Sequence, residues 1–257
     1  MIRPPIVMVH GAFCGGWVFD AFSTPFREAG HRVIAPDLPG HEARERAVPV
    51  AGLSMRDYAR AVAGLAVALE APPVLIGHSL GGLVALLAAA RAPTAGVILL
   101  APSAPWGVAG ATMEEAVSAL SLYALGPYWA LPIAPDYSTF RRFCLDRLER
   151  AERRALFARL TRESGRAIFE TLNWWLDPFM TTRAQPERIG APILIISGAR
   201  DAIHPTATAR DTARKLGARL EVMPQMSHWL IGEPGWEAVA DRCLAWLGAE
   251  ATPVAAE

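Results

Sequence analysis

The sequence of 257 residues is poor in cysteine and lysine and carries no net charge. Its three cysteines, Cys14, Cys144 and Cys243, have neither the spacing of a metal site nor that of a disulfide framework. Lys215 is the only lysine, and we attribute the excess of arginine to coding bias rather than to a binding surface. Because 25 basic residues balance 25 acidic ones, the composition favours neither a nucleic-acid partner nor an acidic substrate.

Long apolar runs, repeats and low-complexity tracts are also absent. No run is long enough to cross a bilayer, and the residues before the first predicted strand contain no apolar leader region. The cysteine usage is typical of a reducing compartment. Together these absences predict a cytoplasmic protein without a membrane partner, built as one large α/β domain with an insertion.

Short apolar runs alternate with helical patterns along most of the chain. A helix predicted over 54–70 starts with Ser54 as its N-cap and Asp57 at the capping-box position. Runs that are apolar throughout indicate parallel strands buried on both faces of a sheet. The predicted strands cover residues 6–9, 32–36, 73–76, 96–100, 193–196 and 220–223.

The strongest functional signal follows the predicted strand 73–76. That strand leads into Gly77-His78-Ser79-Leu80-Gly81 and then into an Ala/Leu-rich helix predicted over 83–92. Strand, tight turn and helix are the context of a nucleophile elbow, in which flanking glycines let the helix pack against the strand. The pattern predicts that Ser79 is a nucleophile in a strained backbone conformation, at a helix N-terminus that favours negative charge.

The alternation of strands and helices stops between Leu100 and Pro192. This stretch is helical in pattern, rich in aromatic residues and interrupted by prolines. An insertion of this length in a compact sheet indicates a function. We predict a helical cap over residues 104–185, with 1–103 and 186–257 forming the core, and a solvated charged face over 141–166.

A serine nucleophile needs a base, and the base needs a third group that orients it. After a nucleophile elbow these groups follow in the order acid, then histidine. Asp201 lies just past the strand predicted at 193–196, and His228 lies just past the last predicted strand. Both are at carboxyl ends of strands, where open α/β sheets hold their sites. The sequence therefore predicts a catalytic triad of Ser79, His228 and Asp201.

The other histidines are predicted to have structural roles. His78 lies inside the elbow, and its side chain is expected to turn away from the substrate. His10 and His41 follow predicted strands and are expected to fix loops by hydrogen bonding. His31 and His204 are expected to be solvated.

The tetrahedral intermediate of such a reaction needs backbone N–H groups that bind its oxyanion. One is predicted from Leu80, directly after the nucleophile. The other is predicted from the glycine-rich loop after the first strand, with Ala12 as the first choice and Phe13 as the second. The alternative for this loop is a tight turn without a catalytic role.

These motifs together resemble the α/β-hydrolase superfamily, most closely its small esterase branch, which includes plant methyl-ester esterases and hydroxynitrile lyases. The resemblance implies an α/β-hydrolase fold, a mostly parallel sheet of about six strands flanked by helices, with the cap inserted before the strand preceding Asp201. It implies no metal or organic cofactor. The motifs that carry it are Val9-His10-Gly11-Ala12-Phe13-Cys14-Gly15-Gly16-Trp17, Asp37-Leu38-Pro39-Gly40-His41, Gly77-His78-Ser79-Leu80-Gly81-Gly82, Gly198-Ala199-Arg200-Asp201 and Ser227-His228-Trp229.

Three residues argue against particular enzyme classes within this superfamily. Ser79 argues against the related haloalkane dehalogenases and epoxide hydrolases, which use an aspartate nucleophile. Gly11 and Trp229 argue against hydroxynitrile lyases, whose plant members typically carry threonine and lysine there.

The leading hypothesis is a carboxylic-ester hydrolase that acts through an acyl-enzyme, as a monomer or homodimer. Phe13, Trp106, Trp129 and Trp229 are predicted to bind a small-to-medium apolar, ester-like substrate. The first alternative keeps the triad but cleaves a C–C bond, a lactone or a thioester. The second is a ligand sensor on a hydrolase fold that binds an apolar molecule with little turnover.

Overall fold

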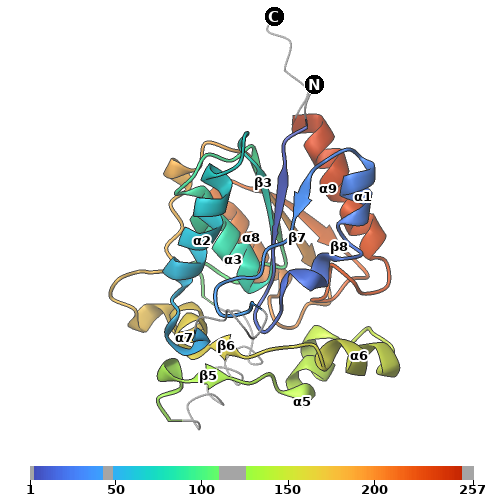
Figure 1. The fold of residues 1–257 in the computed structure, drawn as a ribbon. Coiled ribbons are helices and arrows are strands. Elements are labelled where there is room, and N and C mark those ends of the chain that lie inside the picture. Colours follow the sequence, from blue (N-terminus) through green and yellow to red (C-terminus); the bar gives the residue numbers. More distant parts are fainter. Residues whose placement is uncertain (1–2, 43–48, 110–125, 251–257) are drawn as a thin grey trace, which may run out of the picture.

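The computed structural model describes residues 3–42, 49–109 and 126–250, which form a central sheet with helices on both faces (Figure 1). Every pair of neighbouring strands in this sheet is parallel, which confirms the predicted α/β architecture. The strands are β1 (Ile6–Val9), β2 (Val33–Ile34), β3 (Val74–His78), β4 (Gly96–Leu100), β7 (Ile193–Gly198) and β8 (Arg219–Met223), and their order across the sheet is β2-β1-β3-β4-β7-β8.

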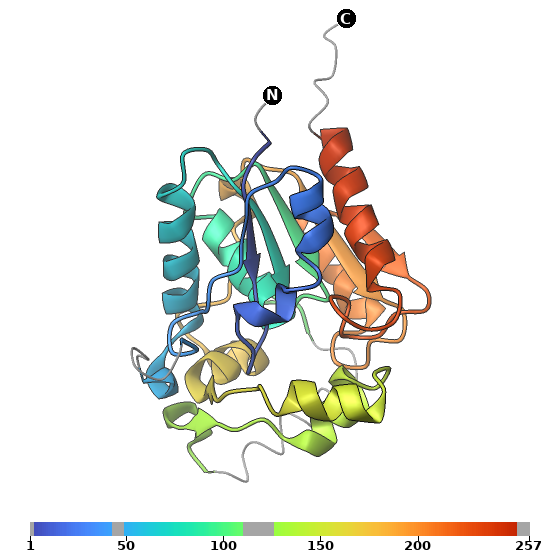
Figure 2. The same cartoon turned by 45° about the vertical axis from the view of Figure 1, so that its right-hand side comes forward.

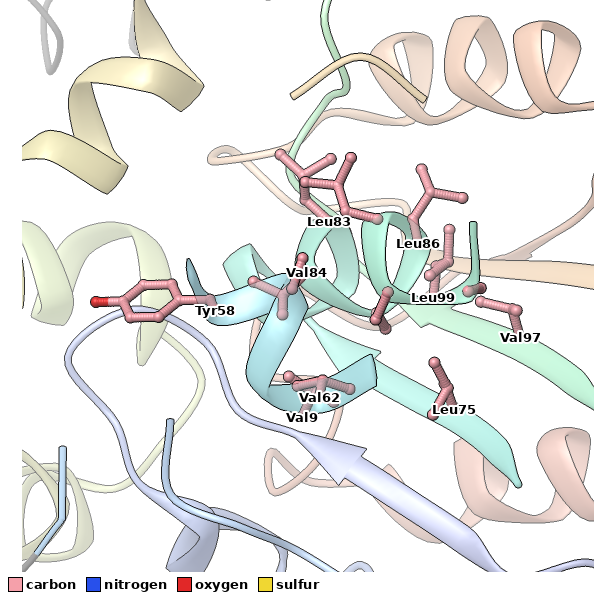
Figure 3. Packing of buried hydrophobic residues seen from close by; sticks show 14 of the residues in the cluster. Val9, Tyr58, Val62, Leu75, Leu83, Val84, Leu86, Val97 and Leu99 are labelled. Carbon is pink, nitrogen blue, oxygen red and sulfur yellow. The ribbon is translucent and has the colours of Figure 1, made fainter. Parts of the chain in front are cut away.

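Two layers of helices cover the sheet. Successive side chains along a strand point to opposite faces, so each strand packs against both layers. On one face, helices α2 (Met55–Val67), α3 (Leu80–Ala89) and α8 (Thr206–Leu216) cover a buried cluster that includes Val9, Leu75 and Leu99 (Figure 3). On the other face, α1 (Thr24–Glu28) and α9 (Trp236–Glu250) lie side by side (Figure 2). The inner strands β1 and β4 therefore carry no polar side chain, because both of their faces are buried, whereas the edge strand β8 carries Arg219 and Glu221 and is only partly buried.

Helix α2 starts as the sequence predicts and ends at Val67, earlier than expected. The Ser54 hydroxyl accepts a hydrogen bond from the Arg56 N–H, and the Asp57 carboxylate accepts one from the Ser54 N–H at 3.0 Å. The segment between β1 and β2 contains only short helices. It holds the short 3-10 helix η1 (Gly16–Phe19) before α1, and a second one, η2 (Val50–Gly52), precedes α2.

The inserted segment is defined here as residues 101–192, between β4 and β7. Residues 126–172 of it lie beyond the carboxyl ends of the strands, and residues 186–192 run back along the core to the start of β7 (Figures 1 and 2). It contains short helices, as expected, but also an antiparallel pair of strands that the sequence pattern did not predict. The domain division at 104–185 stays a prediction, and residues 110–125 of it lie outside the described residues. The elements are η3 (Tyr128–Ala130), β5 (Pro132–Ile133), α5 (Tyr137–Thr139), η4 (Phe140–Cys144), α6 (Arg150–Phe157), β6 (Glu163–Ser164), α7 (Gly165–Leu172), η5 (Trp174–Leu176) and η6 (Pro186–Arg188).

Two buried carboxylates attach the inserted segment to the start of α2. Glu170 accepts hydrogen bonds from the Ser54 hydroxyl at 2.8 Å and from the Met55 N–H at 2.9 Å. Glu163, which is fully buried, accepts one from the Tyr58 hydroxyl at 2.6 Å. The prediction of a solvated charged face over 141–166 is therefore wrong for Glu163, because its partners are distant in sequence. Within the described ranges, no helix is both long and apolar enough to span a membrane.

The glycines of the elbow hold β1, β3 and α3 in close contact. A Cβ atom on Gly81 would lie 2.2 Å from the carbonyl oxygens of Val9 and His10, and one on Gly77 would lie 2.2 Å from the Gly81 oxygen. These distances are far below van der Waals contact, so the sheet and the helix can meet only because both residues lack side chains.

Two glycine-to-alanine variants test this packing. Gly81→Ala should lower the free energy of unfolding by about 1–3 kcal/mol or more, because backbone must move to admit the methyl group. Gly64→Ala, on the exposed side of α2 with nothing within 4 Å of the new Cβ, should raise it by roughly 0.5–1 kcal/mol through helix propensity. Urea denaturation measures both. Equal effects of the two variants would contradict the packing argument.

Candidate active site

Ser79 occupies the sharp turn between β3 and α3 in a strained conformation. Its backbone angles are φ 55° and ψ −124°, a region that non-glycine residues rarely adopt. Its N–H donates to the Leu100 carbonyl at 2.9 Å, and its own carbonyl accepts from the N–H groups of Gly82 and Ser103. These bonds hold the turn, so the half-buried Ser79 hydroxyl projects past the carboxyl edge of the sheet, as the elbow pattern predicts.

The structure brings Asp201 and His228 to this hydroxyl from the loops after β7 and β8. His228 Nδ1 lies 2.9 Å from Asp201 Oδ2, and His228 Nε2 lies 3.1 Å from Ser79 Oγ. Burial disfavours the Asp201 carboxylate, but the adjacent His228 and hydrogen bonds from the loop outweigh burial and hold its pKa below the usual value. An ionised carboxylate only accepts hydrogen bonds, so Nδ1 carries the proton and Nε2 is free to accept from Ser79.

Several of the other histidines fix the loops around this centre. His78 Nε2 donates to the carbonyl of His228 at 2.9 Å, and burial lowers the pKa of His78 to about 3, so the ring is neutral. His10 Nε2 accepts from the Leu38 N–H at 2.9 Å. The predicted solvation of His31 is wrong, since its ring is buried and its Nδ1 lies 2.9 Å from the Pro4 carbonyl oxygen.

The two candidates for the second oxyanion donor differ in what their N–H groups bind. The Phe13 N–H already donates to Glu163 Oε2 at 3.1 Å. The Ala12 N–H has no partner within the part of the chain that the structure describes. Leu80 is the first residue of α3, so its N–H has no acceptor inside the helix. Ala12 and Leu80 are therefore the N–H groups available to an oxyanion.

A cavity of about 180 Å³ opens beside Ser79, between the sheet edge and the inserted segment. Its lining is mainly apolar, and burial raises the pKa of its two thiols, Cys14 and Cys144, so both are neutral. The core contributes Gly11, Ala12, Phe13, Cys14, His78, Ser79, Leu80, Ile203, His204, His228 and Trp229, and the inserted segment contributes Ser103, Thr139, Phe140, Cys144, Ile168, Thr171 and Leu172.

Of the four aromatic residues predicted to bind substrate, Phe13 and Trp229 line this cavity, and Trp106 and Trp129 do not. Trp106 packs edge-on against Trp174, with ring centroids 5.4 Å apart. Trp129 is 44% exposed and packs against Phe169 in the inserted segment. Both rings pack against other aromatic rings of the inserted segment, and a role of either in substrate binding stays a prediction.

Sequence reasoning missed the polar pair Ser103 and His204. Both line the cavity, and Ser103 Oγ lies 3.1 Å from His204 Nε2. The centroid of the His204 ring lies 5.3 Å from that of His228, and the backbone N–H of His204 donates to Asp201 Oδ1 at 2.9 Å. Its position three residues after Asp201 is a local signal that could have suggested a place in the site rather than in solvent.

Glu163 was missed as well, because its segment looks like an exposed charged helix. Its Oε2 lies 3.2 Å from His41 Nε2 and accepts from Phe13, while Oε1 accepts from Tyr58 and from the Ser164 N–H. Burial opposes charge on both partners, but mutual attraction raises the pKa of His41 and lowers that of Glu163. The pair is therefore a buried ion pair beside the glycine-rich loop.

The loop that carries His228 has its own contacts with the inserted segment. The Ser227 hydroxyl donates to Asp146 Oδ1 at 2.8 Å, and the Ser227 N–H donates to Glu233 Oε1 at 2.6 Å. Arg147 Nε lies 3.5 Å from the other oxygen of Glu233. Burial nevertheless raises the pKa of Glu233 to about 7, because these partners compensate it only in part.

This pKa makes stability depend on pH in a defined direction. The ordinary pKa of a glutamate is 4.5, so between about pH 4.5 and about pH 7 Glu233 is more protonated in the folded protein than in the unfolded chain. The free energy of unfolding therefore falls as pH rises through this range. Glu233→Gln removes this pH dependence and keeps an acceptor for the Ser227 N–H. The free energy of unfolding of the variant, relative to that of wild type, should therefore rise from pH 5 to pH 8. Urea denaturation at both pH values checks this, with Glu237→Gln, an exposed glutamate of α9, as the control. A difference that does not change with pH would contradict it.

Comparisons with known proteins agree with the fold. The model described as the alpha/beta hydrolase family matches residues 6–242, and the chain belongs to this family. Its relatives are named esterases, which confirms the predicted enzyme class, a carboxylesterase-type hydrolase.

Three similar proteins illustrate the relationship. A pimeloyl-[acyl-carrier protein] methyl ester esterase from Aromatoleum aromaticum is 33% identical over 244 residues, covering 89% of this chain and 92% of that protein. One of the same name from Neisseria meningitidis serogroup B is 29% identical over 228 residues, covering 87% and 85%. The crystal structure of the methylesterase MES16 from Arabidopsis superposes with a TM-score of 0.73 at 18% identity, covering 96% and 99%, and shows the shared fold.

Proposed function

We propose that the protein is a serine esterase in which Ser79, His228 and Asp201 form the catalytic triad. The observation that carries this proposal is the continuous chain of hydrogen bonds from Asp201 through His228 to Ser79, which ends in the cavity. In the first half-reaction, Ser79 Oγ attacks the carbonyl carbon of the ester while His228 Nε2 accepts the proton of the Ser79 hydroxyl. The N–H groups of Ala12 and Leu80 bind the oxyanion that forms.

Collapse of the tetrahedral intermediate breaks the bond to the alcohol, which leaves with the proton from His228. Water then enters, loses a proton to the same His228 nitrogen and attacks the acyl-enzyme. The second tetrahedral intermediate releases the carboxylic acid and restores the Ser79 hydroxyl. The ionised Asp201 keeps the His228 ring in the required tautomer and stabilises its positive charge in both halves.

The substrate we propose is an ester with a small-to-medium apolar acyl group. The support for this is the size of the cavity, about 180 Å³, and its mainly apolar lining. We further propose that residues 104–185 act as a cap that covers the apolar acyl group of the bound substrate, since Phe140, Ile168 and Leu172 contribute to that lining.

Replacement of the nucleophile tests the mechanism. Ser79→Ala should lower kcat for p-nitrophenyl esters by at least about 10³-fold, because only the oxyanion site and substrate binding remain. Initial rates on a series of increasing acyl length, with wild type and variant side by side, measure this, and the optimum length gives the reach of the cavity. Retained turnover in Ser79→Ala would contradict the proposed mechanism.

A second candidate substrate is an acyl methyl ester carried on a protein. Two observations favour it: the name of the Aromatoleum relative, and a groove on the inserted segment lined by Tyr137 and four arginines. Those arginines suit a partner that presents anionic groups. They are Arg141, Arg150, Arg153 and Arg154.

Charge reversal in this groove separates the two candidates. Arg150→Glu with Arg154→Glu should raise KM for a methyl ester attached to acyl-carrier protein by roughly tenfold, an effect that added salt reduces, because both residues are exposed charges. Hydrolysis of p-nitrophenyl esters should be unchanged. The control is Arg210→Glu, an exposed arginine of α8 outside the inserted segment. Unchanged KM for the carrier-bound ester would leave the small-molecule ester as the substrate.

A further inference from the structure

We propose that Glu163, contributed by the inserted segment, is a positioning residue that holds the oxyanion loop, defined as residues 11–14, in its catalytic conformation. This inference rests on the proposed serine-esterase function. Glu163 has no contact with Ser79 or His228 among the described residues, so it would act through the backbone of the loop. Its function would be to fix where the Ala12 N–H points.

The first argument is that residues 161–163 bind both polar groups of the Phe13 backbone. The Phe13 N–H donates to Glu163 Oε2 at 3.1 Å, and the Phe13 carbonyl accepts from the Thr161 N–H at 2.8 Å. The Phe13 N–H belongs to the peptide unit that joins it to Ala12. Holding that unit in place therefore limits rotation of Ala12, the residue whose own N–H faces no protein acceptor in the described chain.

The second argument is that the loop needs such support. Phe13 has φ 66°, a left-handed conformation that is strained for a non-glycine residue. The loop also lies directly on the nucleophile, since a Cβ on Gly11 would lie 3.1 Å from Ser79 Cβ. A strained loop without an external acceptor would relax, and relaxation at this point would move the N–H groups that face the reacting carbonyl.

The third argument is that Glu163 is itself held rigidly. It is fully buried, and its two oxygens accept from groups of four separate residues. Tyr58 and the Ser164 N–H bind Oε1, and His41 shares Oε2 with Phe13. These hydrogen bonds use every acceptor position of the carboxylate, and His41 is its counter-ion. A change of rotamer would break these buried contacts and is therefore unfavourable.

The chain offers a matched control in Glu170. This residue is a buried carboxylate of the same segment and also accepts from the start of α2, through Ser54 and Met55. Among the described residues, it makes no hydrogen bond with the oxyanion loop. Removing either carboxylate weakens attachment of the inserted segment, but only the loss of Glu163 should affect the Ala12 N–H.

The experiment compares Glu163→Met with Glu170→Met on a p-nitrophenyl ester that wild type hydrolyses, at a temperature well below the Tm of each variant. Glu163→Met should lower kcat by about 10- to 100-fold, less than the roughly 10²- to 10³-fold cost of deleting an oxyanion donor, with KM nearly unchanged. Glu170→Met should lower Tm and leave kcat within about twofold. Glu163→Gln, which keeps one acceptor oxygen, should recover part of the lost kcat.

A second measurement tests the oxyanion site directly. A trifluoromethyl ketone forms a tetrahedral oxyanion adduct on a serine nucleophile, so Glu163→Gln and Glu163→Met should weaken its binding by the same factors as kcat. The corresponding methyl ketone, which binds without this adduct, should bind all variants alike. Because Glu163→Gln changes only one atom, it keeps the test available if the methionine variant does not fold.

The outcomes separate this inference from the proposed function. Equal losses of kcat in Glu163→Met and Glu170→Met, or a loss confined to KM or Tm, would show that Glu163 is only structural. Full kcat in the Glu163 variants would also overturn the positioning role. Failure of the proposed function appears elsewhere, as turnover that survives Ser79→Ala.

Discussion

The close approach of β1, β3 and α3 at the elbow is the constraint on which the other features of the site depend. Gly77 and Gly81 allow it, since a side chain on either would overlap backbone atoms. The contact gives Ser79 its positive φ and brings the loop after β1 over the nucleophile. The parallel strands then bring Asp201 and His228 to the same edge, because all their carboxyl ends point one way.

Much of the core could be predicted from the sequence because its signals are local. The apolar strands, the Ser54 cap and the Gly-x-Ser-x-Gly turn each lie within a few consecutive residues. Asp201 and His228 could be predicted because each follows a predicted strand, in the order acid and then histidine that a nucleophile elbow implies. A short pattern is sufficient for such features because neighbouring residues determine them.

The inserted segment was predicted less well because its structure depends on distant partners. Trp129 looked like a substrate contact, yet it packs against Phe169. Glu163 looked exposed, yet it is buried in contact with His41 and Tyr58, which are both far away in sequence. Neither the hydrophobic periodicity nor the charge pattern of a segment predicts which distant residues its side chains will contact in the folded protein.

The position of Glu163 has a consequence for how this enzyme could be altered. Insertions between β4 and β7 are attractive units to exchange between relatives, because the sheet holds the triad without them. Here the exchanged unit would also remove the acceptor for the Phe13 N–H and the counter-ion of His41. A chimaera could keep the proposed triad and still lose rate, unless the incoming segment supplied a buried carboxylate against the loop after β1.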